Sequence, residues 1–327
     1  MPVFSDPRIR SHAWQLLVLL GVTGAIGYGA HNVVANLARQ GIASGFGFLG
    51  SRAGFSIIQH LISYDEDATY GRAFVVALLN TLLVSILGIL MATLIGFTVG
   101  IARLSRNYLV SRLALTYVEI VRNLPLLLHI FIWYFAALRA LPDVRQSLSL
   151  GDAVFLNMRG LYLPWPSSVG GWHWDKPIQS GFGFDGGVAM LPELIALLLA
   201  LSTYTAAFIA EIVRGGLLAV PRGQWEAAEA LGLSRPQTLR LVIVPQALRI
   251  VIPPLTNQYL NLLKNSSLAA AIAYPDIILV FAGTALTQTG QAVEVIALTM
   301  GVYLVLSLTI SVGMNAYNRR LGAAVRG

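Results

Sequence analysis

Several polar side chains lie at helical spacing within a mostly apolar stretch in the last third of the chain. Asn257, Asn261 and Lys264 occupy positions i, i+4 and i+7, so they share one face of the expected helix, and Ser266 and Ser267 follow at the next turn. Polar groups in a membrane helix face the bundle interior or a watery cavity. These side chains could therefore line a path for a polar solute. They could also join neighbouring helices or a second subunit.

Two acid-base pairs occur elsewhere at i, i+3 spacing. Glu119 is followed by Arg122, and Glu211 by Arg214. This spacing puts both members on one helix face, where mutual neutralisation lowers the cost of charges near lipid. Each pair has a structural and a functional interpretation, and the sequence favours neither.

A short polar segment separates two apolar stretches and has sharp helix signals. Pro221 suits a first helical turn, residues 224–231 are mostly good helix formers, and Gly232 fits the left-handed residue just past a helix end. Ser234 and Gln237 then form a capping box for a second helix. The first helix would be only about 16 Å long at 1.5 Å per residue. The pattern predicts a helix, a sharp turn and a second helix that could fill a groove on another protein.

Two other interpretations of this segment carry less weight. A helix-turn-helix also occurs in DNA-binding proteins, and Arg235, Arg240 and Arg249 could meet phosphate. The flanking stretches are membrane-grade, however, and no soluble domain supports the segment, so we expect no nucleic-acid partner. A plain loop with two helices would not explain why the segment has such well-defined helix start, stop and capping residues.

The chain lacks the motifs of several enzyme classes. Its only lysines, Lys176 and Lys264, follow Asp and Leu, so the Gly-Lys-Ser/Thr end of a phosphate-binding loop cannot be built. The five histidines show no metal-ligand spacing, and cysteine is absent. We therefore expect no catalytic residue, metal or cofactor in this chain.

Composition and hydropathy then define the elements that must position these groups. Of 327 residues, 56% are hydrophobic and only 11% are charged, against roughly 25% charged in an ordinary soluble domain. Stretches long enough to cross a bilayer occur at residues 11–38, 73–102, 113–138, 188–213, 241–282 and 295–318. The sequence predicts an all-α polytopic membrane helix bundle of about six spans, with the fifth broken at Pro253, Pro254 and Pro275.

The motif Glu-Ala-Ala, three residues, Gly, twelve residues, Pro runs from Glu226 to Pro245. It resembles the EAA loop of permease subunits in binding-protein-dependent ABC importers, in which a short helix docks onto a separate ATPase. The residues Tyr204, Thr205 and Ala206 before the loop resemble the polar amino-acid branch of that family. The wider pattern, including Leu-Tyr-Leu-Pro-Trp-Pro at 161–166, resembles the general L-amino-acid permeases. His129 departs from the family pattern, where Gln is expected, and a lone His there is more often a packing residue.

The resemblance implies a type I ABC importer permease core, a zwitterionic amino acid as substrate and no enzyme activity in this chain. The implied partners are ABC ATPase subunits, a second permease subunit in a homo- or heterodimer, and an external or periplasmic amino-acid-binding protein. The substrate path would consist of the polar stripe together with Glu119 and Arg122. The ATPase-docking residues would be Gly223, Gln224, Glu226, Ala227, Ala228, Gly232 and Pro245.

The expected organisation is a permease core with two additions. Residues 1–72 would form an N-terminal anchor span and an external linker, and residues 73–320 the permease domain. That domain would contain a cytoplasmic coupling loop at 214–245 and an irregular external insertion at 139–187, rich in Gly, Pro and Trp. The aromatic side chains of the insertion could contact the binding protein or rest at the membrane interface.

Charge placement predicts the orientation. With the coupling loop inside, thirteen basic residues lie on the cytoplasmic side and seven outside, in agreement with the positive-inside rule. We expect a multi-pass protein of the plasma membrane, or of the inner membrane in a Gram-negative cell, with both termini cytoplasmic. An N-terminal signal peptide is the weaker interpretation, because the first apolar run is too long and lacks a convincing cleavage site.

Two rival classes remain. An ion-coupled secondary transporter would show an inverted repeat with broken helices in both halves, whereas only the second half here has one. A membrane redox enzyme would need paired haem ligands that this sequence does not offer.

Overall fold

The computed structural model describes residues 7–39, 44–167, 172–181 and 183–323. Its helices in chain order are α1 (Pro7–Arg39), α2 (Tyr70–Ala102), α3 (Tyr108–Asn123), α4 (Leu126–Phe131), α5 (Pro192–Leu218), α6 (Arg222–Ala230), α7 (Arg235–Thr238), α8 (Val244–Asn265), α9 (Leu286–Thr289) and α10 (Ala292–Ala323). Single 3₁₀ segments are η2 (Phe46–Gly50), η4 (Val144–Gln146) and η6 (Ser266–Ile272), and π-helical segments are η3 (Ile132–Leu138), η5 (Leu239–Ile243) and η7 (Ile278–Ala285).

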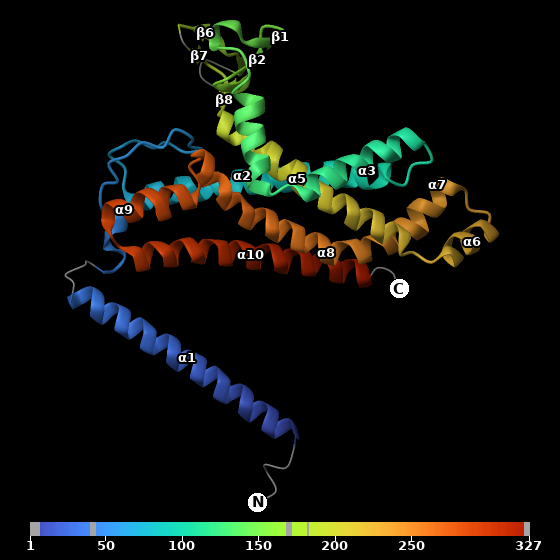
Figure 1. The fold of residues 1–327 in the computed structure, drawn as a ribbon, viewed down its shortest axis with the longest axis horizontal. Coiled ribbons are helices and arrows are strands. Elements are labelled where there is room, and N and C mark those ends of the chain that lie inside the picture. The colour runs from blue at the N-terminus through green and yellow to red at the C-terminus, as the bar shows by residue number, and fades with distance from the viewer. Residues whose placement is uncertain (1–6, 40–43, 168–171, 182, 324–327) are drawn as a thin grey trace, which may run out of the picture.

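The helical core agrees with a membrane bundle, although the number of spans is smaller than expected. Within the described residues, 4 helices are long and apolar enough to cross a membrane, or up to 5 if the bent pair formed by α3 and α4–η3 is one span. That pair turns by 110°, where Leu124 and Pro125 adopt extended backbone. The predicted first span is α1, a 33-residue helix that is not among those four and lies apart from the bundle (Figure 1).

The predicted break of the fifth span at Pro253 and Pro254 is wrong. Both prolines lie inside α8, and the helical path continues from Arg235 to Ile272. Helix α8 packs against α5 and α10, and Val251 and Leu255 are buried before and after the prolines, so the missing hydrogen bonds do not end the helix. The break comes at Ala273, whose φ of 59° is left-handed, just before Pro275.

The insertion between η3 and α5, predicted to be irregular, is instead ordered by short strands. Strands β1 (Leu148–Leu150), β2 (Val154–Asn157), β3 (Gly160–Leu163) and β8 (Val188–Met190) form a 4-stranded antiparallel sheet in that order. Two hairpins accompany it, formed by β4 (Trp165–Ser167) with β5 (His173–Asp175) and by β6 (Ile178–Ser180) with β7 (Gly183–Asp185). The strands stand away from the helices in Figure 1.

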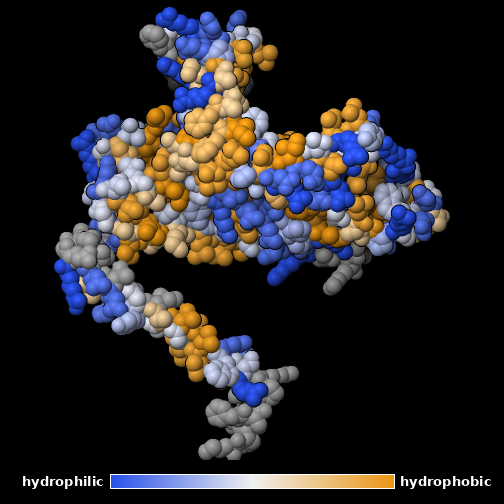
Figure 2. Space-filling model, in the orientation of Figure 1, coloured by the Kyte–Doolittle hydropathy of each residue, from blue (hydrophilic) through white to orange (hydrophobic). Residues whose placement is uncertain are grey.

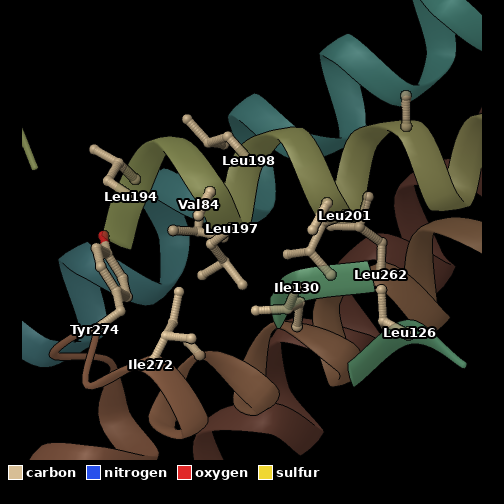
Figure 3. Close-up of a cluster of buried hydrophobic side chains, with 14 of the residues drawn as sticks. Val84, Leu126, Ile130, Leu194, Leu197, Leu198, Leu201, Leu262, Ile272 and Tyr274 are labelled. Carbon is tan, nitrogen blue, oxygen red and sulfur yellow. The ribbon is translucent and has the colours of Figure 1, made fainter. Parts of the chain in front are cut away.

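The core lies around α5, the most enclosed of the four candidate spans. Its apolar window is 61% buried, against 11% for that of α10. Figure 3 shows the buried side chains that meet there from α2, α4, α5 and the segment 262–274, including Val84, Ile130, Leu197, Leu201 and Leu262. A second buried cluster joins residues 48–57 to α2, η7 and α10 near the other end of the bundle.

Small residues on α2 let it approach α5 closely. Gly88, Ala92, Gly96 and Gly100 recur every four residues and are buried on one face of α2. A Cβ added at Gly96 would lie 2.6 Å from the Cβ of Ile209, and one added at Gly100 would lie 2.7 Å from a carbonyl oxygen of α5. Such small-residue stripes are typical of close helix pairs in membranes.

Polar and apolar residues are unevenly distributed over the surface. In Figure 2 apolar residues cover large parts of the helical body, and hydrophilic residues gather at the tip of the insertion and at the end that carries α6 and α7, with further hydrophilic patches on the body between them. This distribution suits a helical body in lipid with polar parts on either side.

Candidate functional site

The segment between α5 and α8 has the predicted helix, turn and second helix. Helix α6 spans nine residues and ends at Ala230, two residues before Gly232, whose φ is +75°. The Gly232 N–H donates to the Glu229 carbonyl at 2.9 Å and the Leu233 N–H to the Ala228 carbonyl at 3.1 Å, which is the Schellman pattern. The Ser234 N–H donates to Gln237 Oε1 at 2.9 Å, so the capping box before α7 is also confirmed. We call α6, this turn and α7 the loop module.

Most residues assigned to docking are exposed on the loop module. Gly223, Gln224, Glu226 and Ala227 are exposed, as is Gly232. Helix α6, which carries four of these residues, lies at one end of the molecule (Figure 1).

Two assigned residues have a different setting. Ala228 is only 3% exposed and therefore packs within the chain. Pro245 lies partly buried at the start of α8, next to Gln246, whose Nε2 donates to Gln224 Oε1 at 2.9 Å.

A small apolar cluster fixes the loop module to the ends of the long helices. Val220, Ile243 and Ala247 are buried together, and Trp225 of α6 packs against them. The module is therefore attached to α8 through side-chain packing as well as through the chain.

The two predicted acid-base pairs differ in the structure. Glu211 pairs with Arg214 of its own helix and also with Arg103, just beyond α2. Glu119 is exposed and forms no ion pair with Arg122 among the described residues. The Arg122 guanidinium lies instead over the Phe208 ring of α5, 5.2 Å from its centroid.

Arg103 is the charged residue that the sequence interpretation missed. It is 108 positions from Glu211, and only the packing of α2 on α5 brings the two together. The sequence did contain a signal for this pair. Arg103 directly follows the uncharged run 73–102, and Glu211 is an acidic residue within another predicted span.

The predicted stripe divides into an exposed and an inward part. Asn257, Asn261 and Lys264 are exposed along α8, and no hydrogen bond or ion pair within the described part of the chain engages their side chains. The opposite face, including Leu262 and Leu263, is buried in the core.

The two serines turn to the backbone of their own helix. Ser266 is buried and its hydroxyl donates to the Leu263 carbonyl at 2.7 Å, while the Ser267 hydroxyl donates to the Lys264 carbonyl at 2.7 Å. The structure therefore brings three of the five stripe residues together as an outward polar face.

His129 has the features of a packing residue. It is 8% exposed, and its Nε2 lies 3.0 Å from the Thr203 hydroxyl and 3.4 Å from the donor Nε1 of Trp133. No group of three or more acidic residues or histidines within the described ranges could hold a metal ion.

The family model described as "Binding-protein-dependent transport system inner membrane component" matches residues 92–327. The chain is 50% identical to the putative amino-acid ABC transporter permease protein YhdX of Escherichia coli (strain K12), over 99% of this chain and 97% of that one. It is 44% identical to the general L-amino acid transport system permease protein AapQ of Rhizobium johnstonii, over 98% and 94% of the two chains.

Solved structures share the fold. A crystal structure of an amino acid ABC transporter with histidines matches with a TM-score of 0.56 at 24% identity, over 77% of this chain and 95% of that chain. An inward-facing MetNI methionine ABC transporter matches with a TM-score of 0.53 at 19% identity, over 76% and 96%. The expected permease core is thereby confirmed as a fold.

Proposed function

The chain belongs to the family of binding-protein-dependent transport system inner membrane components, and we propose that it forms the amino-acid path of an ATP-driven importer and docks a separate ATPase. Its several apolar helices make it an integral membrane permease subunit. The amino-acid substrate is proposed because YhdX and AapQ, at 50% and 44% identity, are named for amino-acid transport.

The loop module carries the docking proposal. A nine-residue helix with an exposed Glu226, closed by a left-handed glycine, presents a compact rigid shape. A groove on an ATPase could take up Gln224, Glu226 and Ala227 directly. Ala228 would act from inside, by seating the helix on its own chain.

The outward face of α8 supports the path. Asn257, Asn261 and Lys264 lie along a candidate span, where unsatisfied amides and ammonium groups are costly. Water, substrate or a second permease subunit would satisfy them. An ammonium and two amides offer donors to an amino-acid carboxylate and acceptors to its ammonium group.

We also propose the partners and the orientation. Two ATPase subunits, a second permease subunit and an external amino-acid-binding protein would complete the importer, with the loop module and both termini on the cytoplasmic side. The thirteen-to-seven distribution of basic residues supports this orientation.

The mechanism follows from how the loop module is attached. Closure of the ATPase pair would displace α6, and the packing of Trp225 on Val220, Ile243 and Ala247 would transmit the displacement to α8. The face that carries Asn261 and Lys264 would then open to alternate sides of the membrane. Glu211, held by Arg103 and Arg214, would keep α2 and α5 moving as one body.

Charge reversal at Glu226 tests the docking proposal. We expect Glu226→Lys to lose co-purification of a co-expressed ATPase subunit, because repulsion replaces attraction in the groove, while membrane levels of the permease stay unchanged. Asp152→Lys, an exposed reversal in the insertion, is the matched control. Normal ATPase recovery and transport in Glu226→Lys would refute the docking assignment.

The orientation is checked on the same membranes. The chain has no cysteine, so a Ser234→Cys variant reports its own side alone. It should react with an impermeant maleimide in inverted vesicles and not in intact cells. The opposite labelling pattern would invert the topology.

A further inference from the structure

A cavity of about 740 Å³ lies beside the insertion, and no residue of the loop module or of the stripe lines it. Segments far apart in the sequence form its wall: residues 55–58, the hairpin of β2 and β3, the start of α5, and the turn that follows η6. Its volume falls in the range of about 300–1,000 Å³ that is usual for small-molecule sites.

Charges of both signs line this cavity. Arg139 and Arg159 contribute guanidinium groups, and Glu193 contributes a carboxylate. The Tyr134 hydroxyl donates to Glu193 Oε1 at 2.8 Å and accepts from Arg139 Nη2 at 3.3 Å. Arg139 and Glu193 are thus tied to the same hydroxyl but form no ion pair with each other within the described part of the chain.

Separated charges of this kind match a zwitterion. A guanidinium group binds a carboxylate through paired donors, and a carboxylate accepts from an ammonium group. The remaining wall includes Phe55, Ile58 and Leu279, which would contact side chains of different size without selecting one.

The backbone of the wall has one unusual residue. Ala273 is the single non-glycine residue with positive φ among the described residues, at 59°. Such a conformation is disfavoured for a residue with a Cβ and concentrates at functional sites. Ala273 ends the helical path that carries Asn261 and Lys264, so the cavity adjoins the end of the proposed path.

We propose that this cavity binds a free α-amino acid, with Arg139 and Arg159 at its carboxylate and Glu193 at its ammonium group. The inference rests on the proposed function as an amino-acid importer. It adds a waiting site, built partly from the insertion, that the substrate occupies before it moves along α8.

Protection of an introduced cysteine tests the site without relying on transport. Ser56 lines the cavity, and the chain has no cysteine of its own. We would prepare Ser56→Cys in the complete importer in lipid nanodiscs without ATP and measure its maleimide labelling rate. The probes are L-glutamate, L-glutamine, L-arginine and L-leucine, with isoamylamine and 4-methylpentanoate as leucine analogues that lack the carboxylate or the amine.

At least one of the four amino acids should slow labelling of Ser56→Cys, and neither analogue should do so. Added separately, Arg139→Gln and Glu193→Gln should each raise the half-protecting concentration about tenfold, since each removes a charged hydrogen-bonding partner. Arg72→Gln, outside the cavity wall, should leave it unchanged, and Ser180→Cys, an exposed serine of β6, should label at one rate throughout.

The outcomes separate the two proposals. Absence of protection in an importer that takes up amino acids overturns the cavity assignment alone. Absence of both protection and uptake overturns the proposed function as well. If the analogues protect Ser56→Cys as well as the amino acid does, recognition of a zwitterion is overturned. The same holds if the half-protecting concentration of the amino acid is unchanged in both Arg139→Gln and Glu193→Gln.

Discussion

The contact between α2 and α5 and the outward face of α8 are opposite solutions to burial in a membrane. On α2, glycine and alanine every four residues bring the backbones so close that an added Cβ at Gly96 would meet Ile209 at 2.6 Å. On α8, the Asn257, Asn261 and Lys264 side chains are exposed, and no hydrogen bond within the described chain engages these side chains. The first surface is complete within one chain, whereas the second needs something from outside it.

This difference divides the molecule by role. A close helix pair, tied further by Arg103 and Glu211, has the features of a fixed body. A polar face on a candidate span is stable only beside water, a substrate or another subunit. The permease function is therefore expected to fail in different ways when the two surfaces are changed.

The largest effect is expected at the α2–α5 contact. Gly96→Leu should force the helices apart, because a Cβ at position 96 would lie against the Ile209 side chain and the Ala206 carbonyl oxygen of α5. We expect the free energy of unfolding to fall by about 3 kcal/mol or more. The measurement is the yield of monodisperse protein after detergent extraction, which should be low. Gly301→Leu on α10, where nothing lies within 4 Å of an added Cβ, should behave like the wild type. A normal yield of Gly96→Leu would show that this pair is not the fixed body.

The next largest effect is expected on the polar face. Asn261→Leu and Lys264→Met should assemble with the ATPase but lose amino-acid uptake by at least about tenfold, because charged and amide partners for the substrate are removed. Thr309→Val on α10 removes an exposed hydroxyl that bonds to its own helix, and should transport normally.

Measuring assembly and uptake on the same membranes separates the roles of the polar face. Dissociation of the complex would assign the face to contacts between helices or subunits. Undiminished uptake in both variants would remove it from the path.

A smaller effect is expected at the turn of the loop module. Gly232→Val should strain a residue whose φ is +75° by about 1–3 kcal/mol. Uptake should fall while membrane insertion persists. Gly232→Asn is the matched variant, since Asn tolerates the left-handed conformation. If Val and Asn gave equal uptake, the shape of this turn would not matter for coupling.

Local signals explain what the sequence could predict. Gly232, Ser234 and Gln237 act within a few residues of one another, so the loop module followed directly from capping rules. The spacing of Asn257, Asn261 and Lys264 likewise determined that they share a face.

Long-range packing explains what the sequence could not predict. Arg103 forms an ion pair with Glu211 only because α2 packs against α5. Arg122 does not pair with Glu119 in its own helix, and its guanidinium lies over the Phe208 ring of α5. Strands of three or four residues, such as β4 and β5, are too short for a periodic pattern, so the sequence predicts an irregular insertion. Local rules predict a helix break at Pro253 and Pro254, whereas packing against α5 and α10 keeps α8 continuous.

The most direct test is amino-acid uptake into proteoliposomes that contain this chain with its ATPase and binding protein. Radiolabelled amino acid should accumulate when ATP is present on the ATPase side and the binding protein is present on the other, and a sodium or proton gradient alone should give none. Accumulation driven by an ion gradient without ATP would contradict the proposed importer and favour a secondary transporter.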